Sequence, residues 1–499
     1  MIEISFTERV VHKFHPFFIV ATLLLFSSPL KAQFAFTPET KEAYQNLIKL
    51  KTVPASQQLS KALQKKPTDG IAIYLENYID VLTVFINEDP ELYKQLLPNE
   101  NKRLEQLKNL DKKSPWYLFT MAEVKLQWAF VKAKSGDEIS AAWSIRQAYK
   151  MLEENQRKYP DFLPNKKSFG LMHILIGSIP EKYLWIAKLA GMHGKVPTGL
   201  SMLDEVIAHD KTYALESQII KLSTAYYILN EKNLTDIKQL YQKHPDNLLL
   251  SFIYSSILMK ETQSEAALKV LSTAPSGTDY LSLPFLHYMH GLIYLNKGDY
   301  HVSQTYFHRY LKMHKGSNFI KDTWFRLFLT HWLPGKHQEA EKSLSKVLTQ
   351  GAAVYDADKY AESFAKKRHF PNKQLMKARL FTDGGYNDLA IKSLDSISLK
   401  ELLTPSDNIE YHYRYARVYH KTGNLQQAIE KYQETINVAE HTPLYFAPNA
   451  ALQLGYIFKS IGDIQKAEEY FNLALSFKNH EYKNSIDNKA KAALSEIGK

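Results

Sequence analysis

The stretch that decides the fold is Ala416–Thr435, which reads ARVYHKTGNLQQAIEKYQET and is echoed 39 positions later by GYIFKSIGDIQKAEEYFNLA. Small residues recur where two helices must cross closely, and large apolar residues recur where the space between them must be filled. A glycine recurs where a turn falls. Self-similarity at a fixed period of this size predicts a tandem array of helical hairpins. The corresponding positions are Ala416 with Gly455, Tyr419 with Phe458, Gly423 with Gly462, Ala428 with Ala467, Tyr432 with Phe471 and Thr435 with Ala474.

The same pattern extends toward the N-terminus at intervals close to the first one. A glycine that ends the first helix of each unit is expected to take a left-handed conformation, which costs glycine least. One hairpin cannot bury its own apolar face, so each unit depends on its neighbours. The small second-helix residues are Ala267, Ser303, Ala340, Ala390, Ala428 and Ala467; the turn glycines, five positions earlier, are Gly298, Gly335, Gly385, Gly423 and Gly462; the bulky residues four positions later are Phe307, Leu344, Leu394, Tyr432 and Phe471.

These residues resemble the tetratricopeptide repeat. The copies at 409–440 and 448–479 match its pattern well, the copy at 284–315 matches fairly, and those at 321–350 and 371–400 are looser. The resemblance covers at least half of the chain and implies an all-α fold, a solenoid of antiparallel helical hairpins. Departures occur at His287 and His290, where the family usually has Trp and Leu, and at Phe328, which replaces a small residue. Because the matching positions are structural, they indicate a fold and not a ligand.

The first 32 residues predict a secretory signal peptide. Lys13 precedes a short apolar run, Phe17–Phe26, and Ala32 offers a small residue before the cut. Cleavage after Ala32 would leave Gln33 at the N-terminus. The Ala-Gln ending resembles exported proteins of the Gram-negative Bacteroidota, which implies the periplasm or cell envelope. The alternative is that the segment stays attached as an N-terminal anchor.

We therefore expect four regions: a signal peptide at 1–32, an N-terminal helical region at 33–160, an apolar helical hairpin or connector at 161–212, and the repeat solenoid at 213–499. Apolar spacing at i, i+3 and i+4 predicts helices in the second region. Their expected bounds are roughly 38–65, 69–87, 90–110, 115–135 and 138–158.

The connector contains two apolar pieces, Ser168–Ile179 and Tyr183–Met192, each too short to cross a bilayer. One interpretation is a buried helical hairpin; the alternative is a membrane-surface or lipid-contacting segment at 168–192. The run from Phe169 through Gly199 also resembles the eukaryotic family that includes the inclusion-body-clearance protein. That resemblance implies only the joining of an N-terminal helical region to tetratricopeptide repeats.

Composition and motifs argue against an enzyme. The chain has no cysteine, which removes disulfides, thiolate metal sites and cysteine nucleophiles. No Gly-rich phosphate loop, HExxH or Gly-x-Ser-x-Gly motif occurs, so no catalytic residue and no cofactor is predicted. His287 and His290 lie three apart, but no carboxylate joins them at ligand spacing, and we predict no metal site. The formal charge of +11 is modest for 499 residues and does not demand nucleic acid.

The resemblance implies that first-helix positions line a concave groove, aromatic toward the middle and basic toward the C-terminus. We predict that this groove binds a protein or peptide with apolar or aromatic anchors and an acidic portion. Phe325, Leu329 and Trp332 either line the groove or are buried between units. The sequence thus indicates an exported, non-catalytic scaffold, and it leaves the partner and the oligomeric state open. The candidate partner-binding residues are Tyr288, Arg379, Tyr413, Arg417, His420, Lys421, Tyr456 and Lys459.

Overall fold

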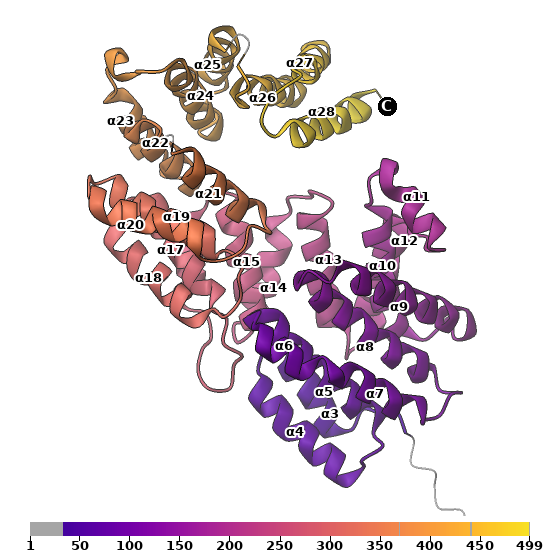
Figure 1. Ribbon diagram of the computed structural model, residues 1–499. Coiled ribbons are helices and arrows are strands. Elements are labelled where there is room, and N and C mark those ends of the chain that lie inside the picture. The colour runs from indigo at the N-terminus through magenta and orange to yellow at the C-terminus, as the bar shows by residue number, and fades with distance from the viewer. Residues whose placement is uncertain (1–32, 369, 440–441, 499) are drawn as a thin grey trace, which may run out of the picture. The chain divides into compact units, whose positions relative to one another are not determined.

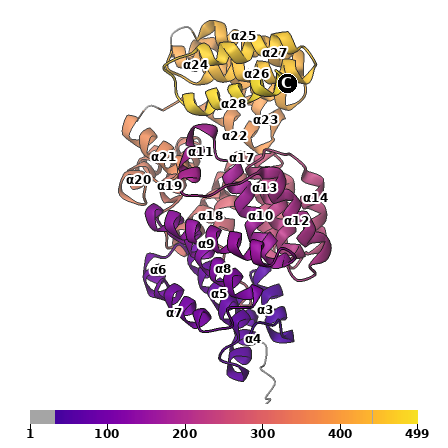
Figure 2. The same ribbon diagram turned by 90° about the vertical axis from the view of Figure 1, so that its right-hand side faces the viewer.

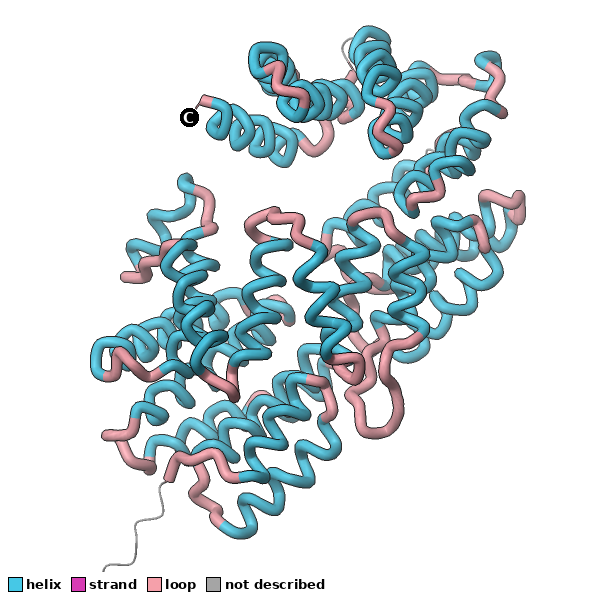
Figure 3. Tube along the Cα trace, turned by 180° about the vertical axis from the view of Figure 1, so that it is seen from behind, coloured by secondary structure: helices cyan, strands magenta, loops and turns pink. Residues whose placement is uncertain are grey.

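A computed structural model describes residues 33–368, 370–439 and 442–498. These residues form helices joined by short loops, with no strand in the described part of the chain (Figure 3). The all-α repeat fold expected from the sequence is thereby confirmed. The expected signal peptide at 1–32 lies outside the described residues. The chain divides into two compact units, which are described separately below.

The first unit comprises residues up to Ile86, Glu91–Asn233 and Gly277–Leu281. The segment Gly277–Leu281 is bonded to the rest of this unit through the backbone. The Leu281 amide donates to the Leu50 carbonyl at 2.8 Å, and the Val53 amide donates to the Asp279 carbonyl at 3.3 Å. Its helices are α3 (Pro38–Ile48), α4 (Thr52–Lys65), α5 (Gly70–Asn87), α6 (Pro90–Leu96), α7 (Pro98–Lys108), α8 (Pro115–Lys134), α9 (Glu138–Lys158), α10 (Leu163–Gly177), α11 (Glu181–Leu189), α12 (Val196–His209) and α13 (Ala214–Tyr227) (Figure 1).

Two of the expected helices are each split in two. The segment 38–65 breaks because Leu50 takes a left-handed conformation at φ 62°, so α3 and α4 form a hairpin. The segment 90–110 breaks before Pro98, which begins α7 because proline is well suited to the first turn of a helix. The helices expected at 69–87, 115–135 and 138–158 agree with α5, α8 and α9 to within one residue.

Within the connector, helix α10 packs against α12, with α11 between them in the chain (Figure 2). Gly170 and Gly199 allow this close crossing, because a Cβ on Gly170 would lie 2.9 Å from the Gly199 carbonyl oxygen. The apolar side chains of α10 are buried: Phe169, Met172, Ile174 and Ile176.

A buried charged network crosses the interior of the first unit. The Lys167 Nζ lies 3.0 Å from Glu123 Oε2 and 2.9 Å from Glu216 Oε2, and all three side chains are at least 87% buried. Four hydroxyl groups donate to the two carboxylates: those of Tyr44 and Tyr78 to Glu216, and those of Tyr74 and Ser168 to Glu123. The network thereby joins α3, α5, α8, α10 and α13. It holds helices together that are far apart in the sequence.

This network predicts a sharp loss of stability in alkali. Burial raises the pKa of its tyrosines well above 10.0, and attraction by Glu123 and Glu216 raises the pKa of Lys167 despite its burial. Groups whose pKa is raised on folding stabilise the protein fully below their unfolded pKa and lose that contribution as pH rises above it. We expect unfolding to set in above about pH 10. The tyrosines concerned are Tyr44, Tyr74 and Tyr78, which donate to the two carboxylates, and Tyr213, whose ring centre lies 5.1 Å from Lys167 Nζ.

The measurement is a parallel alkaline titration followed by helical circular dichroism and by tyrosinate absorbance. The buried phenols are expected to ionise together with the loss of helical signal. A smooth ionisation of all tyrosines with unchanged helical signal would contradict the prediction. The Tyr78→Phe variant serves as a control that removes one donor and one ionisable group of the network.

The second unit comprises Asn87–Pro90, Leu234–Ser276 and Ser282 onward. Its helices pair as successive hairpins, for example α24 with α25 and α26 with α27. They are α14 (Leu234–Lys243), α15 (Leu248–Lys260), α16 (Ser264–Ser272), α17 (Phe285–Lys297), α18 (Tyr300–Met313), α19 (Ile320–Trp332), α20 (His337–Thr349), α21 (Asp356–Lys367), α22 (Lys373–Gly384), α23 (Asn387–Asp395), η1 (Leu399–Glu401), α24 (Pro405–Lys421), α25 (Leu425–Val438), α26 (Phe446–Ser460), α27 (Ile464–Ser476) and α28 (Lys483–Ile497).

The repeat pattern of the sequence is confirmed position by position. All five turn glycines have φ between 78° and 93°. The small second-helix residues and the bulky residues four positions later are buried, each at most 2% exposed. A Cβ on Gly291 would lie 2.6 Å from the Phe307 ring, and one on Gly455 would lie 2.5 Å from the Phe471 ring. The same small-against-aromatic contact therefore recurs in two separate hairpins.

Two further hairpins follow the pattern without having been recognised from the sequence. In each, a residue with positive φ precedes a buried alanine by five positions. The pairs are Leu50 with Ala55 and Gly136 with Ala141, at φ 62° and 85°, and both lie in the first unit. The turn at Leu50 lacks glycine, which hid the pattern, because non-glycine residues rarely adopt this conformation. In the hairpin of Ala267, which the sequence did indicate, Thr262 at φ 57° stands in place of the turn glycine.

Candidate functional site

Charged and aromatic side chains gather on two neighbouring first helices of the second unit, α22 and α24. We call this group the arginine–tyrosine cluster. It includes side chains from α21 and from the residues that begin α26 and α28. Its members are Arg379, Asp383, Glu410, Arg414 and Arg417, with Tyr360, Tyr413, Tyr445 and Tyr482.

Asp383 joins the two helices. Its Oδ1 lies 3.1 Å from Arg417 Nη1 on α24, and its Oδ2 lies 3.8 Å from Arg379 Nε. Arg379 and Asp383 are four residues apart on α22, the spacing that brings two side chains to one helical face. One carboxylate therefore holds two guanidinium groups from successive repeats near one another.

Arg414 is the buried member of the cluster, with 2% of its side chain exposed. Its Nε donates to Glu410 Oε1 at 2.8 Å, and the guanidinium lies 5.5 Å from the centre of the Tyr413 ring and 5.6 Å from that of Phe446. Its Nη1 has no hydrogen-bond partner. An unpaired buried donor costs free energy.

The cluster carries an excess of positive charge. Burial acts to raise the pKa of the Asp383 carboxyl, but attraction by Arg417, Arg379 and Arg414 outweighs it and holds that pKa below its usual value. Asp383 is therefore ionised at neutral pH. With Glu410 paired to Arg414, three cations face two carboxylates, and one positive charge is left uncompensated.

Tyrosine rings surround these charges. The Tyr360 hydroxyl accepts a hydrogen bond from Arg379 Nη1 at 3.3 Å. The Tyr445 ring lies 5.8 Å from Tyr413 and 5.4 Å from Tyr482, measured between centres. Tyr482 is 55% exposed, so the outer part of the cluster is accessible to a partner.

The structure brings together three of the eight predicted partner-binding residues, Arg379, Tyr413 and Arg417, in this cluster. The side chains of Arg379 and Arg417 are 31% and 26% exposed. Tyr288 and Tyr413 are instead core residues, 4% and 2% exposed. The Tyr288 hydroxyl donates to Asp322 Oδ2 at 2.5 Å, and the Tyr413 hydroxyl accepts from Asn449 Nδ2 at 2.6 Å. These two tyrosines pack against the next repeat and are therefore not at the surface, where they were expected.

The other four predicted residues are dispersed. His420 is half-buried, with Nδ1 3.4 Å from the Tyr432 hydroxyl, and burial together with nearby Lys421 and Arg417 lowers its pKa. Lys421 is exposed at the end of α24. The Tyr456 ring packs at 5.3 Å against Phe471, and Lys459 Nζ lies 2.5 Å from Glu496 Oε2.

Sequence analysis left two alternatives for three apolar residues in the middle of the array, lining the groove or being buried, and burial is confirmed. Phe325, Leu329 and Trp332 are buried, each at most 7% exposed. The sequence missed the central roles of Asp383 and Arg414. Asp383 stands four residues after Arg379, and this spacing is the one sequence signal that could have identified it.

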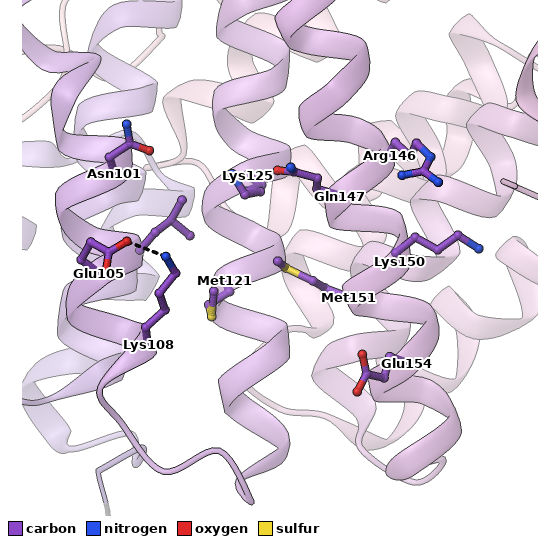
Figure 4. A pocket seen from close by; sticks show the side chains of 11 residues that line it. Asn101, Glu105, Lys108, Met121, Lys125, Arg146, Gln147, Lys150, Met151 and Glu154 are labelled. Atoms are coloured by element: carbon purple, nitrogen blue, oxygen red, sulfur yellow. Dashed lines mark hydrogen bonds and ion pairs between the residues drawn. The ribbon is translucent and has the colours of Figure 1, made fainter. Parts of the chain in front are cut away.

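A pocket of about 450 Å³ opens in the first unit between α7, α8 and α9 (Figure 4). Its cations are engaged in contacts with the protein. Lys108 Nζ lies 2.5 Å from Glu105, Lys125 Nζ lies 3.7 Å from Glu100, and Arg146 Nε donates to the Ala190 carbonyl at 3.0 Å. The pocket therefore lacks a convergent set of available polar groups.

The histidines of the α17–α18 hairpin are packed among aromatic rings. His290 stacks on Tyr306 with centres 4.5 Å apart, and its Nδ1 lies 2.9 Å from the Leu286 carbonyl oxygen. Burial lowers the pKa of both His287 and His290. Among the described residues, no group of three or more histidines and carboxylates is arranged to hold a metal ion.

Part of the chain matches a known family. Residues 408–479, which span most of α24 and all of α25–α27, match the family model of the tetratricopeptide repeat. Over these residues the chain is of the tetratricopeptide-repeat type. No curated protein matches it in sequence. Among solved structures, the human IFIT1 dimer with PPP-AAAA is similar over 89% of this chain and 95% of that one, at 13% identity and a TM-score of 0.31. Tetratricopeptide repeats are protein-interaction scaffolds in general.

Proposed function

We propose that the arginine–tyrosine cluster binds an acidic, aromatic-containing segment of a protein partner. The observation that carries this proposal is the convergence of Arg379, Arg414 and Arg417 around only two carboxylates. Arginine and tyrosine are the residue types that most often dominate binding energy at protein interfaces. An acidic segment supplies the charge that the cluster lacks.

The geometry favours recognition over mere stabilisation of the fold. A guanidinium group has five N–H donors, and the contacts of Arg417 with Asp383 use one nitrogen. Asp383 restrains the two partly exposed arginines before a ligand arrives, so less side-chain entropy is lost on binding. A ligand carboxylate could pair with both guanidinium groups.

The proposal is non-catalytic, because the cluster contains no nucleophile beside a base and no group tuned for proton transfer. It needs neither cofactor nor metal. We further propose that the protein acts after export, in the periplasm or cell envelope. Sequencing of the protein isolated from cells tests this: Gln33 is expected as the first residue, and retention of Met1 or residues near it would contradict export with cleavage.

Binding can be measured with a fluorescent random copolymer of glutamate and tyrosine, which offers both anchor types. The double variant Arg379→Gln with Arg417→Gln is expected to weaken binding by at least about 30-fold, because each arginine of a binding centre typically contributes about 1 kcal/mol or more. Raised salt should weaken the wild type and have little effect on the variant.

The matched control is Arg309→Gln, since Arg309 is an exposed arginine that also lies over a tyrosine ring, Tyr306, but belongs to a second helix. Its binding should equal that of the wild type. Equal binding by the double variant would exclude the cluster as the site. Preference for an RNA oligonucleotide over the copolymer would replace a protein partner with a nucleic acid.

A further inference from the structure

A second surface, in the first unit, is apolar and uncovered. Four large side chains of α9 and α11 are exposed, and we call them the α9–α11 patch: Ile139 at 87%, Trp143 at 59%, Trp185 at 60% and Leu189 at 81%. Single exposed apolar residues are common, but a group with two tryptophans indicates an interaction surface. The arginine–tyrosine cluster has no part in it.

Apolar side chains lie on two faces of α11. Ala187 and Ala190 face α9 across a pocket of about 680 Å³, whose lining is almost wholly apolar and includes Ile139 and Trp143. Trp185 and Leu189, one turn apart, lie on the other side of the helix. Arg146 fixes α11 beside α9, because it lies 5.7 Å from the Trp143 ring and donates to the Ala190 carbonyl.

We propose that this patch docks the protein on the surface of an anionic lipid membrane. A helix that is apolar on both sides is normally covered on both sides. A rigid protein partner that covers Trp185 and Leu189 would leave the pocket on the α9 side open. Lipid is fluid, and it surrounds a helix that enters the interface while its chains fill the adjoining pocket.

The composition of the patch and its charges fits lipid. Tryptophan is enriched where a membrane meets water, since its ring is apolar and its N–H is polar. Lys188 on α11 and Lys195, six residues beyond its end, are exposed. These cations complement anionic headgroups. No helix in the described part of the chain has the length and hydropathy of a bilayer-spanning segment.

Vesicle flotation of the mature chain, residues 33–499, tests the proposal. The probes are vesicles of phosphatidylcholine alone and of an equimolar mixture of phosphatidylcholine and phosphatidylglycerol. We expect the wild type to float with the mixed vesicles and less with the neutral ones. The variant Trp185→Ser with Leu189→Ser should bind at least tenfold more weakly, with an unchanged helical signal.

The matched control is Leu403→Ser with Ile461→Ser, which removes two apolar side chains that are 84% and 54% exposed in the second unit. It should float like the wild type. Failure of the wild type to float, or equal flotation of the patch variant, would overturn the proposal. If the wild type does not float but is a dimer that the patch variant dissociates, the patch is a protein interface and the lipid proposal is wrong.

Discussion

Replacing Lys167 with alanine should lower the free energy of unfolding of the first unit by about 3 to 5 kcal/mol. The change removes the ammonium group that lies between Glu123 and Glu216 and leaves two buried carboxylates without their cation. The tyrosine hydroxyls cannot compensate, because they already donate to these oxygens. Denaturant unfolding followed by circular dichroism measures the effect.

The neighbouring residue provides a control of the same chemical type. Lys166 Nζ lies 2.6 Å from Glu205 Oε2, but the Glu205 side chain is 48% exposed. Lys166→Ala should therefore cost less than about 1 kcal/mol, as expected for a surface ion pair. Similar losses for the two variants would show that the buried network contributes no more than a surface pair.

Replacing Phe471 with alanine should destabilise the second unit by about 3 to 5 kcal/mol. The ring is completely buried, and it fills the space that Gly455 leaves in the facing helix. Its loss creates a cavity between α26 and α27 that the surrounding residues can close only in part. Thermal or denaturant unfolding measures the change, and Ile461→Ala, at a position that is 54% exposed, should have little effect.

The contact between Gly455 and Phe471 can also be tested by changing the glycine. Gly455→Ala should cost about 1 to 3 kcal/mol, because the new Cβ would lie 2.5 Å from the Phe471 ring. Adding Phe471→Ala removes the clashing ring atoms, so the double variant should be less unstable than the sum of its parts. Strict additivity of the two changes would show that the glycine and the ring are not coupled.

The sequence predicted the features that depend on residues close together in the chain. A turn glycine, a small residue five positions later and a bulky one four positions beyond that constrain one hairpin, so their repetition identified the repeats. Leu50 concealed one hairpin because nothing in the identity of this residue indicates a positive φ. The first unit's α8–α9 hairpin, by contrast, carries the expected glycine at Gly136.

Only part of the candidate site could be predicted, because the sequence pattern indicates only features that depend on residues close together in the chain. Arg379 and Arg417 follow from their positions in first helices, but the burial of Tyr288 and Tyr413 depends on the packing of the next repeat. The Lys167 network joins residues up to 172 positions apart, and no local pattern connects them. The exposure of Trp185 follows from the pairing of α10 with α12, which the two apolar pieces of sequence did not indicate.

The return of Gly277–Leu281 to the first unit has a consequence for how the chain folds as it is made. The Leu50 carbonyl accepts a hydrogen bond from an amide 231 residues further on. The native contacts of the N-terminal part therefore cannot all form until more than half of the protein has been synthesised. The later hairpins each close over short distances and can fold one after another. The end of the chain that emerges first is thus among the last parts to make all of its native contacts.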